Sequence, residues 1–403
     1  MSTSLLYHAF GIRGYDYVKT DYQEGEVVFT IRQRPHTYRC PVCNSRAVAP
    51  RGHQQRTFKA VPIGGKPVAV VLAIPRVECL ACAIIRQVPI AFADPRRSYT
   101  RAFERYALEL SRRMTIQDVA QHLDVSWDTI KDIQKRDLHR RFKKPRLRKL
   151  KQIAIDEICI GAGHRYLTIV LNLETGAVVF VGDGKGADAL KPFWRRLKAS
   201  RAKVEAVATD MSAAYIGAVT RCLPDATLVF DRFHVMKLCN DKLAALRRQL
   251  YRDATEAGKA VLKGVRWLLV KRPENLEAGR GERERLEEAL QLNAALATAY
   301  YLKEELSDFW EQDDEEQATA FLLDWLARAE ASGVKILVSL AKTLRKHALG
   351  LLAYYDYPIS TGPLEGTNNK IKTMQRQAYG YRDREFFELK ILACHEAKYA
   401  LVG

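Results

Sequence analysis

The stretch Gln152-Ile-Ala-Ile-Asp156-Glu-Ile-Cys-Ile160 decides the fold, because it is a short apolar run with a carboxylate inside a predicted strand. Strands at 166–172 and 177–182 follow after connections too short for a crossover, which predicts an antiparallel meander. The pattern then predicts a helix over 186–198, a strand over 204–210, a helix over 212–222 and a strand over 227–230. The middle of the chain is therefore expected to be a mixed sheet with helices.

Three antiparallel strands followed by alternating helices and strands is the order of a ribonuclease H-like fold. In that fold the first and fourth strands are neighbours, so Asp156, towards the end of the first, and Asp210, which ends the fourth, are expected to meet. Two adjacent carboxylates are unfavourable unless a cation lies between them. The pair therefore predicts a catalytic divalent metal site, with Mg²⁺ or Mn²⁺ as the ion. Taken singly, each aspartate could equally be a strand-end cap.

A third carboxylate follows a long helical region. Residues from about 238 to 355 have helical spacing throughout, which predicts an inserted helical domain. Beyond it, Pro363 suits the first turn of a helix on which Glu365, Asn369, Lys372 and Arg376 share one face. We interpret Glu365 as a metal ligand and the other three as DNA phosphate contacts; an ordinary exposed helix is the alternative. A final helix is expected from about residue 384 to 400.

Four of the eight cysteines form two Cys-x-x-Cys pairs, Cys40 with Cys43 and Cys79 with Cys82. Two such pairs can supply four thiolates to one tetrahedral Zn²⁺. Strand-like runs at 57–63 and 67–75 lie between the pairs, with Gly64-Gly65 as the turn, so a zinc ribbon is predicted. A redox pairing, or His36 or His53 as a substitute ligand, are the alternatives.

A helix-turn-helix is predicted directly after the ribbon. A helix is expected over 100–113, and helical spacing then recurs from 115 to 123, followed by a turn and a second helix that Ser126 can cap. Such a helix enters the DNA major groove. Residues 135–151 carry ten basic residues and one acidic residue, which indicates an arm that contacts the DNA backbone. The predicted DNA contacts of these two segments are Ser126, Trp127, Thr129, Lys131, Arg140, Arg141, Lys143 and Lys144.

Size and charge agree with this division. The chain has 403 residues, 47% of them hydrophobic, and a net charge of +18. The first 150 residues hold 28 Lys and Arg against 13 Asp and Glu, so most of the excess charge precedes the predicted sheet and indicates a polyanion-binding module. The sequence contains no apolar run of about 18 residues and no signal-peptide pattern, so we expect no membrane association and a cytoplasmic protein.

As a set, these motifs resemble those of a known family. Asp156, Asp210 and Glu365 match the DDE triad of bacterial insertion-sequence transposases. The segments Ile155-Asp-Glu157, Ala208-Thr-Asp-Met211, Phe230-Asp-Arg-Phe-His234 and Gly362-Pro-Leu-Glu-Gly-Thr-Asn-Asn369 look like those of the ISL3 family. The resemblance covers essentially the whole chain. Asp231-x-x-His234 is also similar to a signature of related transposases, which implies that both residues support the active site; a helix-start histidine in the core is the alternative for His234.

The resemblance implies a DNA transposase that binds terminal inverted repeats and target DNA. It implies two-metal phosphoryl transfer, a homodimer or higher oligomer on double-stranded DNA, and association with the bacterial nucleoid when DNA is bound. Trp267 is a candidate for stacking on an unpaired base, although a place in a helical core is the more ordinary interpretation. A catalytically silent DNA-binding regulator and a ribonuclease H-fold nuclease are the alternative functions.

The predicted domains cover the whole chain. They are a zinc ribbon (1–95), a helix-turn-helix with its basic linker (96–150), a first catalytic part (151–240), a helical insertion (241–355) and a last catalytic part (356–403).

Overall fold

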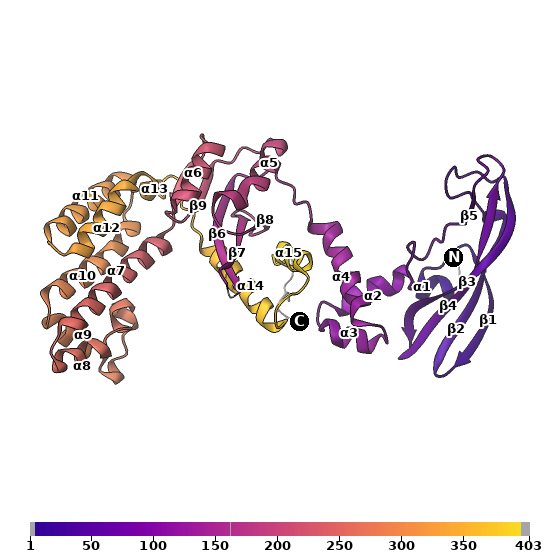
Figure 1. Cartoon of the computed structure of the whole chain (residues 1–403), viewed down its shortest axis with the longest axis horizontal. Coiled ribbons are helices and arrows are strands. Elements are labelled where there is room, and N and C mark those ends of the chain that lie inside the picture. The colour runs from indigo at the N-terminus through magenta and orange to yellow at the C-terminus, as the bar shows by residue number, and fades with distance from the viewer. Residues whose placement is uncertain (1–4, 162, 396–403) are drawn as a thin grey trace. The chain divides into compact units, whose positions relative to one another are not determined.

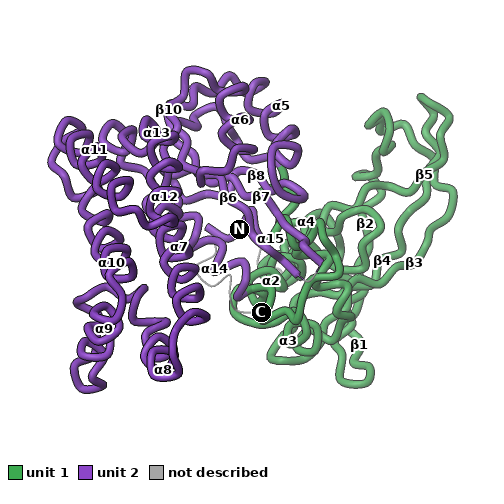
Figure 2. Tube along the Cα trace, turned by 60° about the vertical axis from the view of Figure 1, so that its left-hand side comes forward, with its two compact units in different colours: residues 1–143, 374–390, 397–403 green, residues 144–373, 391–396 purple. Residues whose placement is uncertain are grey.

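The computed structural model describes residues 5–161 and 163–395 and divides them into two compact units (Figure 2). The first unit comprises residues 5–143 and 374–390, and the second comprises 144–161, 163–373 and 391–395. Helix α14 (Gly362–Gln377) therefore begins in the second unit and ends in the first. The final helix, predicted to residue 400, is α15 (Arg384–Leu392) and ends in a turn over residues 393–395; the predicted part beyond residue 395 lies outside the described residues.

The first unit contains a five-stranded sheet in the order β1-β2-β4-β3, with β5 paired to β4. The strands are β1 (Tyr15–Gln23), β2 (Glu26–Gln33), β3 (Val48–Ile63), β4 (Lys66–Cys79) and β5 (Ile85–Gln87). The predicted hairpin is confirmed, because β3 and β4 pair antiparallel up to Ile63 opposite Lys66 and the turn glycines 64 and 65 have positive φ. The strands are longer than predicted, and β1 and β2 were not predicted at all.

Three helices follow, and each begins at a side-chain cap. They are α2 (Arg101–Leu110), α3 (Ile116–His122) and α4 (Trp127–Phe142), preceded by Thr100, Thr115 and Ser126 respectively. The predicted Ser126 cap is confirmed, because its hydroxyl accepts a hydrogen bond from the Thr129 amide at 3.2 Å. Apolar side chains from all three helices, including Phe103, Val119 and Ile130, form one buried core. The three-helix arrangement predicted from the sequence is thus present.

The second unit contains a five-stranded mixed sheet in the order β10-β9-β6-β7-β8. Its strands are β6 (Gln152–Gly161), β7 (Arg165–Asn172), β8 (Val178–Asp183), β9 (Ala206–Thr209) and β10 (Thr227–Phe230). Strands β6, β7 and β8 form the predicted meander, and β9 pairs parallel with both β6 and β10. The prediction that the first and fourth of these strands are neighbours is confirmed. Helices α5 (Lys191–Ser200) and α6 (Ala213–Cys222) lie beside the sheet (Figure 1).

Between β10 and α14 the chain is helical, as predicted. The helices are α7 (Arg232–Asp253), α8 (Glu256–Gly264), α9 (Glu282–Gln291), α10 (Ala294–Leu306), α11 (Glu315–Ala331), α12 (Lys335–Lys346) and α13 (Ala348–Leu352), with 3-10 turns between α8 and α9 and between α10 and α11. One apolar cluster holds them together, with the fully buried Trp325 among its members. The ordinary interpretation of Trp267 was wrong: this side chain is 66% exposed, and the Arg266 guanidinium lies 4.7 Å from its ring centroid. Within the described residues, no helix combines the length and apolarity needed to cross a bilayer.

Candidate active site and DNA-binding helices

The sheet register places Asp156 and Asp210 side by side. Strands β6 and β9 pair in parallel from Gln152 opposite Ala206 to Ala154 opposite Ala208. Each aspartate therefore stands two residues beyond the same paired position, on adjacent strands whose backbones lie about 4.8 Å apart. Asp156 lies in the middle of β6 and not towards its end as expected, because β6 continues along β7 to Gly161 after its pairing with β9 stops.

The Asp156 carboxylate lies in a sheltered, polar environment. One oxygen accepts a hydrogen bond from the Glu157 amide at 2.7 Å, and the other accepts one from the side-chain amide of Asn368 at 2.9 Å. Burial raises the pKa of Asp156, and the negative charge of Asp210 adds to the rise, although the Glu157 amide and His234 oppose it. A carboxylate that is hard to ionise beside a second carboxylate gains most from a nearby cation.

Asp231 and His234 lie at the start of α7, next to this pair. Asp231 caps α7 through the Phe233 amide at 3.1 Å, and its Oδ2 lies 3.5 Å from His234 Nδ1. Burial lowers the pKa of His234, but the carboxylates of Asp231, Asp156 and Asp210 outweigh burial and raise it overall. His234 therefore lies within the electrostatic reach of both strand aspartates.

Asp231 also contacts the segment that leads into α14. Its second oxygen, Oδ1, accepts a hydrogen bond from the Thr361 amide at 3.0 Å, and both residues are buried. Leu364, Asn368 and Ile371 form the buried face of α14. Glu365 lies one turn before Asn368 on the exposed side of this helix.

The three carboxylates do not converge closely in this structure. Over residues 5–161 and 163–395, the candidate metal-binding group consists of four cysteines, whose sulfur atoms all lie within 4.8 Å of one another. It does not include Asp156, Asp210 or Glu365. The structure therefore brings together Asp156, Asp210 and His234, with Asn368 as the link to α14. Asn368 was missed as a site residue, because the helical face chosen from the sequence was the exposed one, centred on Asn369.

The four cysteines of the two Cys-x-x-Cys pairs form that group. Cys40 Sγ lies 3.7 Å from Cys82 Sγ, and Cys43 Sγ lies 3.4 Å from Cys79 Sγ. The backbone amides of Cys43 and Val42 lower the pKa of the Cys40 thiol to about 6, which favours the thiolate that binds metal. Four sulfurs at these separations suit one tetrahedral Zn²⁺.

The basic residues among the predicted DNA contacts of α4 and its C-cap pair with acidic groups of their own unit. Lys131 Nζ lies 3.1 Å from Asp383 and 5.6 Å from the ring centroid of Trp127, a half-exposed side chain. Lys143 pairs with Glu385 at 3.1 Å, whereas Arg140 and Arg141 lie 2.5 Å and 3.5 Å from Asp137. Ser126 and Thr129 join through their hydroxyls at 2.9 Å, and Lys144 is exposed.

The predicted contacts on α14 share an exposed face. Asn369, Lys372 and Arg376 are all exposed, in agreement with their helical spacing. The acidic partners of α4, Asp383 and Glu385, were not foreseen, because they follow the predicted catalytic glutamate by about 20 residues and nothing local links them to α4. Asp383 binds both Lys131 and Lys135, and it also caps α15 through the Phe386 amide.

Three family descriptions match consecutive parts of the chain. A DDE transposase description of the ISL3 type matches residues 153–391. The helix-turn-helix domain of transposase family ISL3 matches residues 87–137, and the zinc-finger of the transposases IS204, IS1001, IS1096 and IS1165 matches residues 36–82. The chain belongs to the ISL3 family of transposases. The ISL3 match to residues 153–391 includes both strand aspartates, Glu365 and the helices between them.

Characterised relatives agree with the assignment of this ISL3 transposase. The transposase for insertion sequence element IS1001 of Bordetella parapertussis is 32% identical over 362 residues, which cover 88% of each chain. The transposase for insertion sequence element IS1557 of Mycobacterium tuberculosis is 28% identical over 385 residues, covering 88% of this chain and 85% of the relative. A Drosophila P element transposase strand transfer complex aligns at 12% identity over 66% of this chain and 80% of that chain, with a TM-score of 0.32, which is too low to define a shared fold. The ISL3 transposase is therefore a DDE enzyme with a zinc ribbon and a helix-turn-helix.

Proposed function

We propose that this ISL3 transposase binds the terminal inverted repeats of an insertion sequence and catalyses metal-dependent cleavage and transfer of DNA strands. The observation that carries the proposal is the common register of Asp156 and Asp210 on adjacent parallel strands, with Asn368 joining Asp156 to the helix of Glu365. The strand order supports a ribonuclease H-like catalytic domain, interrupted by the helices after β10. The domain boundaries given above belong to the same proposal.

Asp156, Asp210 and Glu365 are the proposed ligands of the catalytic Mg²⁺ or Mn²⁺. The donor set fits a hard divalent cation, because these are carboxylate oxygens and because Asn368 adds a buried amide oxygen, Oδ1, that has no hydrogen-bond partner among the described residues. Bound cations would lower the pKa of the attacking water or 3′-hydroxyl. They would also stabilise the negative charge that develops on the leaving oxygen. Glu365, on the same helix as Asn368, would complete the set when DNA and metal are bound.

The remaining residues have proposed roles around this centre. Asp231 positions the start of α14 through Thr361, and His234 lies beside the aspartates, whose carboxylates raise its pKa. Asn369, Lys372 and Arg376 hold phosphates near the cut, while α4 and the basic segment after it bind the repeat. We further propose Zn²⁺ at the four cysteines, assembly as a homodimer or larger oligomer that holds two DNA ends, and a nucleoid-associated protein in the bacterial cytoplasm.

Strand transfer of a labelled terminal repeat, assayed with Mg²⁺, tests the proposal. Asp210→Ala and Glu365→Ala should each lower the rate by a factor on the order of 10³ or more and leave repeat binding intact, because both side chains lie outside α4 and the basic segment that bind the repeat. Full strand-transfer activity in both variants would show that Asp210 and Glu365 are not catalytic metal ligands. Repeat binding without any strand transfer in the unaltered protein would favour a DNA-binding regulator.

A further inference from the structure

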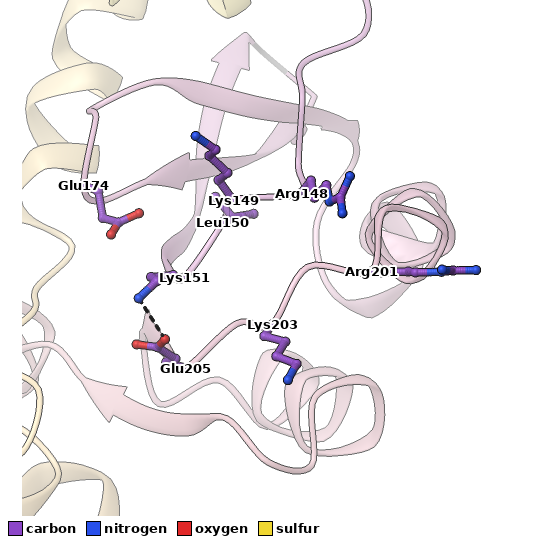
Figure 3. Close-up of a pocket in the computed structure, with 8 residues that line it drawn as sticks. All are labelled: Arg148, Lys149, Leu150, Lys151, Glu174, Arg201, Lys203 and Glu205. Carbon is purple, nitrogen blue, oxygen red and sulfur yellow. Dashed lines mark ion pairs between the residues drawn. The ribbon is translucent and has the colours of Figure 1, made fainter.

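A basic hollow lies in the second unit at the end of the sheet where β6 and β9 begin (Figure 3). Its volume is about 530 Å³. Five cationic and two anionic residues supply nearly all of its lining, and Leu150 is the one apolar contributor among the lining residues. The lining residues are Arg148, Lys149, Leu150, Lys151, Glu174, Arg201, Lys203 and Glu205.

The backbone around the hollow is fixed. Leu147 and Leu150 are both buried in the core of the second unit, on either side of the exposed Arg148 and Lys149. The carbonyl of Lys151 accepts hydrogen bonds from the amides of residues 205 and 206 at 2.7 Å and 3.3 Å. The second half of the basic segment is therefore a surface of this unit, where the sequence had indicated an arm that contacts the DNA backbone.

The cations of the hollow are less neutralised than those of α4. Lys151 pairs with Glu205 at 3.3 Å. Arg148, Lys149, Arg201 and Lys203 have no carboxylate within 4.0 Å in the described part of the chain, and all four are exposed. On α4, by contrast, acidic partners hold Lys131, Lys135 and Lys143. The hollow thus keeps a surplus of positive charge available to a polyanion.

This site is separate from the carboxylates. Strand β9 begins at Ala206 beside the hollow, and Asp210 follows its other end, a span of about 13 Å at about 3.3 Å per residue. No aromatic side chain lines the hollow that could stack on a base. Its chemistry therefore suits phosphate groups and not base edges.

We propose that this hollow binds the phosphodiester backbone of duplex DNA, at a second contact point on the catalytic unit away from the strand aspartates. The inference rests on the proposed function and extends it to residues outside the basic segment, Arg201 and Lys203. The contact positions DNA without reading its sequence, because every duplex presents the same phosphates.

The test uses the full chain and measures the affinity for duplex DNA at a series of salt concentrations. Arg201→Asn with Lys203→Gln removes two cations; asparagine is chosen because Arg201 has a φ of +56°, which asparagine tolerates well. Each lost phosphate contact should lower the steepness of log affinity against log salt by about 1. The double variant should therefore have a slope smaller by about 2, whatever the DNA sequence. Lys191→Gln is the matched control, because this exposed lysine of α5 already pairs with Asp188 at 2.7 Å.

A change of opposite sign sharpens the test. Glu174→Gln removes an unpaired acid from the lining and should tighten DNA binding, because it removes repulsion from the phosphates. If the hollow instead bound cations, Glu174→Gln would weaken binding of its ligand, because a negative charge would be lost. Tighter binding in Glu174→Gln and a lower slope in the double variant together support the proposal.

Three results would overturn it. If the double variant has the same slope of log affinity against log salt as the unaltered chain, and the unaltered chain binds DNA, the hollow does not contact DNA. The proposed function is not affected by that result. If inorganic phosphate binds at residues of the hollow but the double variant keeps the salt slope of DNA binding, the hollow is a site for small anions. Weaker DNA binding in Glu174→Gln excludes phosphate as the occupant. Failure of the unaltered chain to bind any duplex would instead contradict the proposed function.

Discussion

The Oδ1 atom of Asp231 lies 3.0 Å from the backbone nitrogen of Thr361 and joins two points of the chain that are 130 residues apart. Asp231 follows the last strand of the sheet, and Thr361 precedes the helix that carries Glu365. The helices between β10 and α14 therefore begin and end at one buried hydrogen bond. This bond allows a long helical insertion without displacing Glu365 from the neighbourhood of the sheet.

Asp231→Ala should lower the free energy of unfolding of the second unit by about 2–4 kcal/mol. The helix cap contributes about 1 kcal/mol, and a buried Thr361 amide left without an acceptor costs about 1–3 kcal/mol. Urea denaturation followed by circular dichroism measures the change. The exposed Asp225→Ala should differ by less than about 0.5 kcal/mol. Equal stability of the two variants would mean that Asp231 does not hold the ends of the insertion together.

Asn368→Ala should reduce strand transfer by about 10- to 100-fold, because residues that orient metal ligands typically have effects of that size. Activity should fall because the variant lacks the side-chain amide that donates a hydrogen bond to Asp156 at 2.9 Å and so connects Asp156 to α14. Repeat binding should remain, and the concentration of Mg²⁺ needed for half-maximal activity should rise. Gln377→Ala, an exposed position at the end of the same helix, is the control. A drop in activity without any shift in the Mg²⁺ dependence would contradict a positioning role.

The purified chain should contain one Zn²⁺, held by the four clustered cysteines. Cys79→Ser should lose the metal, measured by elemental analysis, and lower the thermal stability of the first unit, because structural zinc supplies folding free energy. Cys159→Ser should keep the Zn²⁺ and the thermal stability of the first unit, because Cys159 is exposed and belongs to the second unit. Full zinc content in Cys79→Ser would rule out the four-cysteine site.

Asp383→Asn should tighten binding to duplex DNA and steepen its salt dependence by about 1 unit of slope. Asp383 neutralises Lys131 and Lys135 of α4, and its removal frees positive charge for phosphates. Asparagine is also a good cap, so α15 should keep its first turn. Asp225→Asn is the charge-matched control. Unchanged affinity in Asp383→Asn would show that these ion pairs do not compete with DNA.

The same carboxylate gives a pH prediction. Burial raises the pKa of Asp383, but the Phe386 amide and the ammonium groups of Lys135 and Lys131 outweigh burial and lower it to about 2. Because the folded pKa lies below the unfolded value of about 3.9, the carboxylate stabilises the fold above about pH 4 and loses this effect as the pH falls through 2. The difference in stability between the unaltered protein and Asp383→Asn should therefore be constant from pH 7 to 5 and shrink below pH 4. A difference that persists at pH 2 would contradict this assignment.

The sequence by itself determined the local structure and the sites whose ligands lie close together along the chain. The apolar periods of 152–160, 166–172 and 227–230 predicted β6, β7 and β10, since a half-buried strand must alternate or be apolar throughout. The Cys-x-x-Cys spacing predicted the cysteine cluster, because a two-residue spacer lets both sulfurs of a pair face one ion. Ser126 identified the start of α4, because a cap acts on amides within its own turn.

The tertiary structure alone decided which distant groups meet. Asn368 and Asn369 have the same side chain, and the burial of Leu364 and Ile371 on one face of α14 turned Asn368 towards Asp156. Likewise, the basic run from 135 to 151 looked uniform, yet its first half pairs with Asp383 and Glu385 while its second half lines a hollow with Arg201 and Lys203. Both outcomes depend on contacts between residues far apart in the chain, and local periodicity carries no information about such contacts.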